Sequence, residues 1–152
     1  MSDNANLDAT LDRLVAWYGD GANGTAPNRA QWHALIQRPQ DQAITLINFF
    51  KMRDAAVYPA GNRQETISGE EAFARYADVS VPTVERVGGK FLLLAPFEFS
   101  FLGPKEDWDL VAIGSYPNAA ALLSLLEDSG YRAAYPHRSA ALARQKVLAC
   151  AA

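Results

Sequence analysis

Residues 43–53 read AITLINFFKMR. The run is almost continuously apolar and rich in Ile and Phe, and it is too short to favour a buried helix. A run of this kind is typical of a strand whose two faces are both covered. We therefore expect a strand over residues 43–53 in the interior of a sheet.

The segments that follow alternate between helix and strand patterns. After a loop around residues 58–62, Ser68 is expected to cap a helix that ends at Gly88-Gly89. Residues 91–101 alternate along the chain and predict a second strand, and Pro96 within it indicates an edge strand or a bulge. The remaining expected elements are a strand over 109–116, a helix from Pro117-Asn118 to Asp128, a short segment carrying residues 131–138, and a strand over 143–149.

The resulting order, β-α-β-β-α-β, is that of the ferredoxin-like fold. Its usual strand order is 4-1-3-2, which places the first strand inside the sheet and the second at an edge. Helices then cover one face of the four-stranded antiparallel sheet. Because the other face is expected to be apolar too, a second copy of the chain is the simplest cover for it. The sequence therefore predicts an α+β, ferredoxin-like domain over residues 41–152 that pairs with a second copy of the chain.

Residues 1–40 have a different pattern. Leucines at positions 7, 11 and 14 predict a short amphipathic helix that ends at Gly19, and residues 27–37 predict a second one. We interpret residues 1–40 as an N-terminal extension of two short helices, which covers either the sheet edge or the mouth of a pocket.

Composition excludes several classes of partner. The 152 residues include 14 Lys and Arg against 17 Asp and Glu, a formal net charge of −3, so no basic excess is available to bind nucleic acid. The acidic N-terminal residues contain no apolar run typical of a secretory signal, and no stretch approaches the roughly 18 apolar residues of a membrane span. Cys150 is the lone cysteine. These features predict a soluble, cytoplasmic protein with no membrane contact.

No strong catalytic, phosphate-binding or cofactor motif is present, so chemistry has to be sought in isolated polar residues. Asn48 lies among apolar residues, where an unpaired buried amide would cost about 1–3 kcal/mol. It either bonds a neighbouring segment or faces a ligand. Arg53, His137 and Arg138 are expected to converge, because the first strand ends where the antiparallel fourth strand begins. They would hold an organic anion, or else form structural ion pairs and a loop cap.

Aromatic residues add candidates for a pocket wall. The candidates combine an apolar ring with a polar tip, which suits small ligands; they are Tyr76, Trp108, Tyr131 and Tyr135. Core or dimer contacts are the alternative. The acidic residues at positions 106, 107 and 109 lie on one turn, and this is more typical of a solvated surface than of a metal site. We expect no metal and no cofactor.

Several motifs together resemble a known family. They are LINFFKMR at 46–53, SGEEAFARY at 68–76, Gly88-Gly89, Trp108-Asp109 and HRSAAL at 137–142. In this order they resemble the domain-of-unknown-function family numbered thirteen-thirty, of the dimeric α/β-barrel superfamily, over residues 43–149. The resemblance implies a ferredoxin-like protomer whose sheet packs against that of a second protomer. It also places Asn48, Arg53, Tyr76, Trp108, His137 and Arg138 at recurring polar and aromatic positions.

The sequence thus predicts a homodimer that binds a small anionic or carbonyl-bearing compound between sheet and helices. In an enzymatic version, Arg53 and Arg138 hold the anion, Asn48 donates to a developing oxyanion and His137 moves a proton. Such an enzyme would act without a cofactor. The alternative is a non-catalytic dimerisation or ligand-binding module, and the sequence does not decide between the two.

Overall fold

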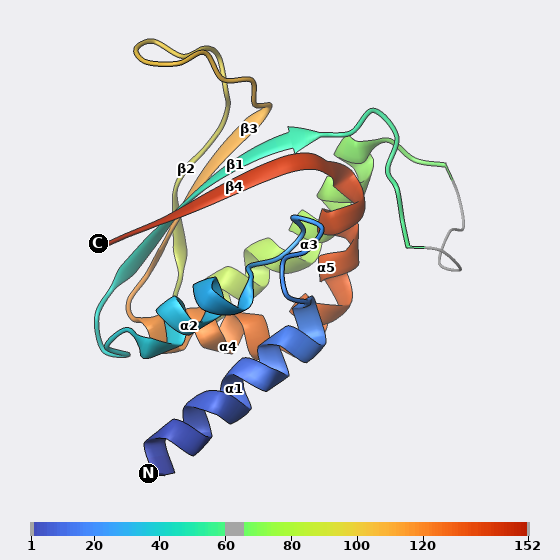
Figure 1. The fold of residues 1–152 in the computed structure, drawn as a ribbon. Helices are drawn as coiled ribbons and strands as arrows, with labels where there is room; N and C mark the ends of the chain where they lie inside the picture. Colours follow the sequence, from blue (N-terminus) through green and yellow to red (C-terminus); the bar gives the residue numbers. More distant parts are fainter. Residues whose placement is uncertain (1, 60–65, 152) are drawn as a thin grey trace.

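The computed structural model describes residues 2–59 and 66–151, so part of the loop expected around residues 58–62 lies outside the described residues. Figure 1 shows the arrangement of the helices and strands. Their order and bounds are α1 Ser2–Tyr18, α2 Arg29–Gln37, β1 Ile44–Met52, α3 Gly69–Arg86, β2 Lys90–Pro96, β3 Leu110–Tyr116, α4 Ala119–Glu127, α5 Ser129–Ala141 and β4 Leu142–Ala151.

The strands form one antiparallel sheet in the order β2-β3-β1-β4. This is the strand order 4-1-3-2, so the predicted α+β, ferredoxin-like fold is confirmed. β1 lies inside the sheet and pairs with β3 and β4, as its continuous apolar run predicted. β2 lies at an edge, and its register shifts between Phe91 and Leu93.

The second strand is shorter than predicted. Its pairing ends at Pro96, and residues 97–109 form a long excursion that protrudes from the sheet (Figure 1). The alternating phenylalanines beyond Pro96 are a strand pattern without a partner strand, and Phe99 and Phe101 are 65% and 89% exposed. The proline marks the edge strand, as predicted, because it has no N–H to donate to a ladder.

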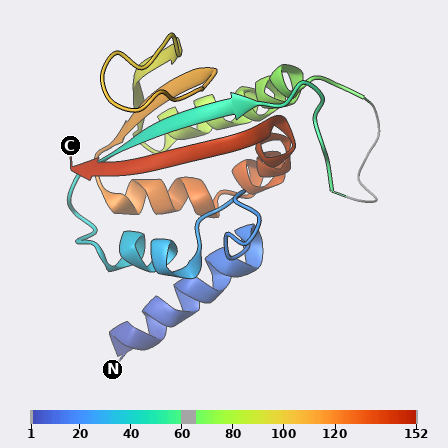
Figure 2. The same ribbon diagram turned by 45° about the horizontal axis from the view of Figure 1, so that its top comes forward.

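The helices form a layer on one face of the sheet (Figure 2). The helix α3 begins where it was predicted, with the Ser68 side chain accepting a hydrogen bond of 3.0 Å from the N–H of Glu71. The prediction for residues 131–138 was wrong, because they belong to helix α5. Asp128 ends α4 and also caps α5, accepting a bond of 2.8 Å from the N–H of Tyr131. The sequence Asp-Ser-Gly therefore starts a helix as well as ending one, and Pro136 is tolerated within it.

The N-terminal helices α1 and α2 pack on the outside of this helical layer (Figure 2). Leu11, Leu14 and Trp32 form a buried cluster against residues of α4. The Tyr18 hydroxyl donates to the carbonyl of Leu126 at 2.5 Å, which fixes the end of α1 to α4. Within the part of the chain that the structure describes, no helix combines the length and the apolar character needed to cross a membrane.

Candidate functional site

A cavity of about 1310 Å³ lies between the sheet and the helices. Because side chains of a strand alternate between the faces of a sheet, Ile44, Leu46, Asn48 and Phe50 of β1 all face the helices and line it. Helices α3, α4 and α5 form the opposite wall, and α2 with the loop before it closes one side. The cavity volume exceeds the usual range of roughly 300–1,000 Å³ for small-molecule sites.

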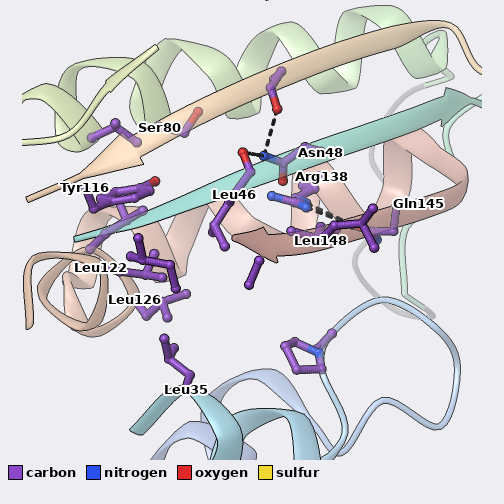
Figure 3. A pocket seen from close by; sticks show the side chains of 18 of the residues that line it. Leu35, Leu46, Asn48, Ser80, Tyr116, Leu122, Leu126, Arg138, Gln145 and Leu148 are labelled. Atoms are coloured by element: carbon purple, nitrogen blue, oxygen red, sulfur yellow. Dashed lines mark hydrogen bonds between the residues drawn. The ribbon is translucent and has the colours of Figure 1, made fainter. Parts of the chain in front are cut away.

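Arg138 places a guanidinium in this largely apolar cavity (Figure 3). The residue is only 9% exposed. Its Nε and Nη2 donate to Gln145 Oε1 at 3.1 and 2.9 Å, and its Nη1 donates to the Tyr76 hydroxyl at 3.1 Å. The guanidinium carbon also lies 4.9 Å from the ring centroid of Phe50. Arg138 is thus held rigidly by neutral groups of β1, α3 and β4.

The buried guanidinium has no anionic partner among residues 2–59 and 66–151. None of the ion pairs formed by these residues includes it. Desolvation lowers the pKa of Arg138, and the negative charge that Tyr76, Tyr135 and Tyr131 carry only once they ionise raises the pKa above its ordinary value. The side chain therefore carries a full positive charge whose neighbours in the fold are neutral.

Three tyrosines surround this charge. The Tyr76 hydroxyl lies 2.7 Å from the Tyr131 hydroxyl, and the Tyr135 hydroxyl donates to the carbonyl of Thr25 at 2.8 Å. Burial raises the pKa of Tyr131 and Tyr135, so both stay neutral at physiological pH. Tyr135 also connects α5 to the loop before α2, which is how the N-terminal segment is held over the cavity.

Asn48 lies at the middle of β1 and faces the same cavity (Figure 3). Its Nδ2 lies 3.1 Å from the carbonyl oxygen of Ala112 and 3.5 Å from that of Leu46. Because both neighbours only accept hydrogen bonds, the amide NH₂ must face them and the amide oxygen must face away. Asn48 therefore offers the cavity an acceptor, whereas the predicted oxyanion contact requires a donor.

The structure brings together only some of the residues that the sequence singled out. Asn48, Tyr76, Tyr131, Tyr135 and Arg138 line the cavity, together with Gln145, which the sequence analysis did not single out. One feature could have predicted the position of Gln145. In the strand order 4-1-3-2, β4 lies beside β1, and Gln145 pairs with Phe50.

Arg53, Trp108 and His137 lie elsewhere. Arg53 lines a separate small cleft of about 250 Å³ at the end of β1. Trp108 packs against Phe49 on the opposite face of the sheet, with their ring centroids 5.7 Å apart. There the guanidinium carbon of Arg144 lies 4.5 Å from the centroid of the Trp108 ring. The expected convergence of Arg53, His137 and Arg138 is therefore not seen.

The side chain of His137 points in a different direction from that of its neighbour Arg138. Successive residues of a helix point about 100° apart, and His137 Nδ1 lies 2.6 Å from the Tyr58 hydroxyl outside the cavity. Burial lowers the pKa of His137, and the Arg75 guanidinium lowers it further. The imidazole is therefore expected to be neutral at pH 7.

The titration of His137 is a testable consequence. Because its pKa in the folded protein lies below the usual value of about 6.5, the folded state binds the proton less readily than the unfolded chain does. His137 thus contributes stability above pH 6.5 or so, and loses it as the pH falls. We expect an NMR midpoint below about 6.5 that moves upward in Arg75→Gln. A midpoint above that of an unfolded chain would contradict this placement.

Comparison with known proteins identifies the family. A family model described as Domain of unknown function (DUF1330) matches residues 62–151. The chain is 32% identical to the protein in a crystal structure of methylated RPA0582 protein, with a TM-score of 0.77 over 84% of this chain and 93% of that one. A crystal structure of the RPA0582 protein of unknown function from Rhodopseudomonas palustris gives 31% identity and a TM-score of 0.76, over 84% of this chain and 95% of that one.

A more distant structure is a dimeric protein of unknown function and ferredoxin-like fold from Bacteroides fragilis NCTC 9343. It is 11% identical, with a TM-score of 0.45 over 75% of this chain and 100% of that one. The curated proteins contain no match to the chain. The family match covers more than half of the chain, and the similarity to RPA0582 protein extends over most of both chains. The protein therefore belongs to the DUF1330 family, as its motifs predicted.

Proposed function

We propose that the protein binds an organic anion in the cavity between sheet and helices, with Arg138 as the group that holds its carboxylate. The observation that carries the proposal is a buried guanidinium without an acidic partner in the described part of the chain. Removing a charge from water is costly unless an opposite charge compensates it. A ligand carboxylate would supply that compensation.

Arg138 has donors left for such a ligand. A guanidinium has five N–H groups, and the bonds to Gln145 and Tyr76 account for three. Two remain, which is the number that a bidentate carboxylate uses. The bonds to Gln145 and Tyr76 also hold the guanidinium plane in place before the ligand arrives, which lowers the entropy lost on binding.

Binding, rather than acid–base catalysis, is the function that this geometry supports. The Asn48 amide uses its N–H groups on backbone carbonyls, and the His137 imidazole bonds Tyr58 outside the cavity. Neither group is placed to donate to a molecule held by Arg138. The Asn48 oxygen is instead available to accept a bond from a hydroxyl or an N–H of the ligand.

The test compares an acid with a neutral molecule of the same shape. Hexanoate is expected to bind at least tenfold more tightly than hexanamide when each is titrated by calorimetry or ligand-observed NMR, because only the acid neutralises Arg138. In Arg138→Gln the difference should disappear. Arg29→Gln is the matched control, because this arginine pairs with Asp12 at the surface. Equal affinities for acid and amide in the unmodified protein would refute the proposal.

We further propose that the protein is a homodimer formed through the outer face of the sheet. Leu93 of β2 pairs with Ile113 of β3, which pairs with Ile47 of β1, which pairs with Leu148 of β4. Residues paired in this way share a face, so an aliphatic row crosses all four strands. The described helices lie on the other face (Figure 2), and Leu93 and Leu148 are 44% and 45% exposed. A second copy of the row would cover them.

Ile47→Lys is expected to make the protein monomeric, because it places a charge in the middle of the aliphatic row. Ile47 faces away from the cavity, so the variant should retain the fold and the binding of hexanoate. Sedimentation velocity at micromolar concentration measures the change, with Gln37→Lys on the exposed side of α2 as the control. A monomeric unmodified protein, or a variant that remains dimeric, would contradict this interface.

A further inference from the structure

We infer that the natural ligand is a monoanion with a long apolar body, of the fatty-acid type, and that its chain lies along β1 away from Arg138. This inference rests on the proposed function and specifies the class of ligand. Three features of the cavity carry it: its length, the position of its charge at one end, and an opening that would let a longer chain continue.

The cavity extends along most of β1. Both Ile44 and Phe50 line it, and at 3.3–3.4 Å per residue the six steps between them span about 20 Å. Arg138 lies against the ring of Phe50, so the charge is at one end of this span. Ile44 pairs with Tyr116 of β3 at the other end. A compact acid at Arg138 would leave most of this length unfilled.

The far end of the cavity is apolar. Leu35 of α2 and Leu122 and Leu126 of α4 line it on the side away from Arg138 (Figure 3). Leu122 belongs to the buried cluster that contains Ile44 and Tyr116, and Leu35 and Leu126 pack against that cluster. Between the two ends, Leu46 and Ala112 of the sheet continue the apolar lining.

Other charged side chains along the lining are engaged elsewhere. Arg38 lies just before β1, and its Nη1 and Nη2 donate to the carbonyls of Gln42 and Ala43 at 2.9 and 2.5 Å. Lys146 Nζ bonds Glu106 at 2.8 Å and lies 4.7 Å from the ring of Phe49, which faces the other side of the sheet. Arg138 is therefore the buried cation of this lining, whereas Arg38 is half-buried and bonded to the backbone. A second carboxylate among the leucines would lose its hydration without a partner.

The cavity opens between β4 and the N-terminal segment. Val147, which pairs with Asn48 on the cavity face, lines it and yet remains 42% exposed, and the loop before α2 is fixed to α5 through the Tyr135–Thr25 hydrogen bond. A chain longer than the cavity would leave along this apolar border. The opening thus sets no sharp upper limit on the length of the ligand's chain. The span along β1 determines how much of that chain is buried and so contributes to the binding free energy.

A series of straight-chain acids tests the inference at concentrations below micelle formation. Each added CH₂ that is buried should strengthen binding about fourfold, so the affinity should rise by about two orders of magnitude from hexanoate to decanoate. Decanedioate should bind at least tenfold more weakly than decanoate, because its second carboxylate lies among leucines. Decan-1-ol should bind more weakly than decanoate in the unmodified protein, and equally in Arg138→Gln.

A variant that fills the apolar end gives a second readout. Leu35→Trp should weaken hexadecanoate binding at least tenfold and leave hexanoate binding unchanged, because only the longer chain spans the cavity as far as α2. Gln37→Trp, on an exposed position of the same helix, should change neither. If affinities for all acids are alike while acids still exceed amides, the chain-length inference is overturned and anion binding stands. If no acid binds, both the proposed anion binding and the chain-length inference are overturned. Tight binding of decanedioate would overturn the inference that the ligand is a monoanion.

Discussion

Arg138→Met is expected to make the ligand-free protein more stable and to abolish its binding of carboxylates. In the ligand-free state the guanidinium is buried without an acidic partner in the described residues, so its desolvation is compensated only by neutral groups. Replacing buried charge by an apolar side chain of similar volume often stabilises a protein. We expect the free energy of unfolding to rise by about 1–3 kcal/mol.

A gain in stability is expected because the substitution leaves none of the hydrogen-bond partners of Arg138 buried and unpaired. Tyr76 keeps its hydrogen bond to the Tyr131 hydroxyl, and Gln145 is half-buried beside the cavity opening, where water can replace the guanidinium. Methionine also retains contact with the ring of Phe50. Binding of hexanoate should weaken at least 100-fold, since a charged, bidentate contact is lost.

Urea unfolding and calorimetry measure the two effects on the same samples. Arg138→Lys serves as the matched control: it keeps the buried charge and loses the planar pair of donors, so it should weaken binding and not stabilise the protein. A loss of more than about 2 kcal/mol in Arg138→Met would be typical of a structural hydrogen-bond network, and would show that Arg138 holds the fold together.

Gly69→Ala is expected to destabilise the protein by about 3 kcal/mol or more. Gly69 begins α3 at the point where the end of β1 and the end of α5 meet. A Cβ built there overlaps the Arg53 carbonyl oxygen and lies 2.8 Å from that of Ala141. Both are backbone atoms, so neither can move aside without shifting a strand or a helix. The Gly69 N–H also donates to the Arg53 carbonyl at 3.1 Å, a bond that such a shift would break.

Gly114→Ala is the control for this prediction. Gly114 lies within β3, and a Cβ there has its nearest neighbour, in the Tyr116 ring, at 3.7 Å, an ordinary contact distance. We expect its free energy of unfolding to change by less than about 1 kcal/mol. Thermal or urea unfolding of both variants checks the pair, and similar stabilities for Gly69→Ala and Gly114→Ala would contradict the packing described here.

The sequence predicted the elements whose local pattern agrees with their surroundings. The run over residues 43–53 indicates an interior strand because β1 lies between β3 and β4, and Ser68 indicates a helix start because its cap is local. The helix α5 was missed because Asp128-Ser129-Gly130 is also a typical end of a helix. The strand β2 was predicted too long because the alternation of Phe97, Phe99 and Phe101 continues the strand pattern beyond Pro96, where the pairing with β3 ends.

The cavity was only partly predictable for a similar reason. Asn48, Tyr76, Tyr131 and Arg138 line it because each is a polar or aromatic side chain on an element that faces the helical layer or the sheet. Proximity in the sequence could not show that His137 and Arg138 point apart, since the helix that separates them was not recognised. The position of Gln145 in the cavity depends on the register of β4 against β1, which is a property of the assembled sheet.

The most direct measurement is a crystal structure of the protein grown with decanoate. We predict that the carboxylate lies with its oxygens about 2.7–2.9 Å from Nη1 and Nη2 of Arg138, and that the hydrocarbon chain follows β1 toward Leu35 and Leu122. Decanoate bound outside the cavity, or a cavity that contains only water at saturating decanoate, would contradict the assignment of Arg138 as an anion site.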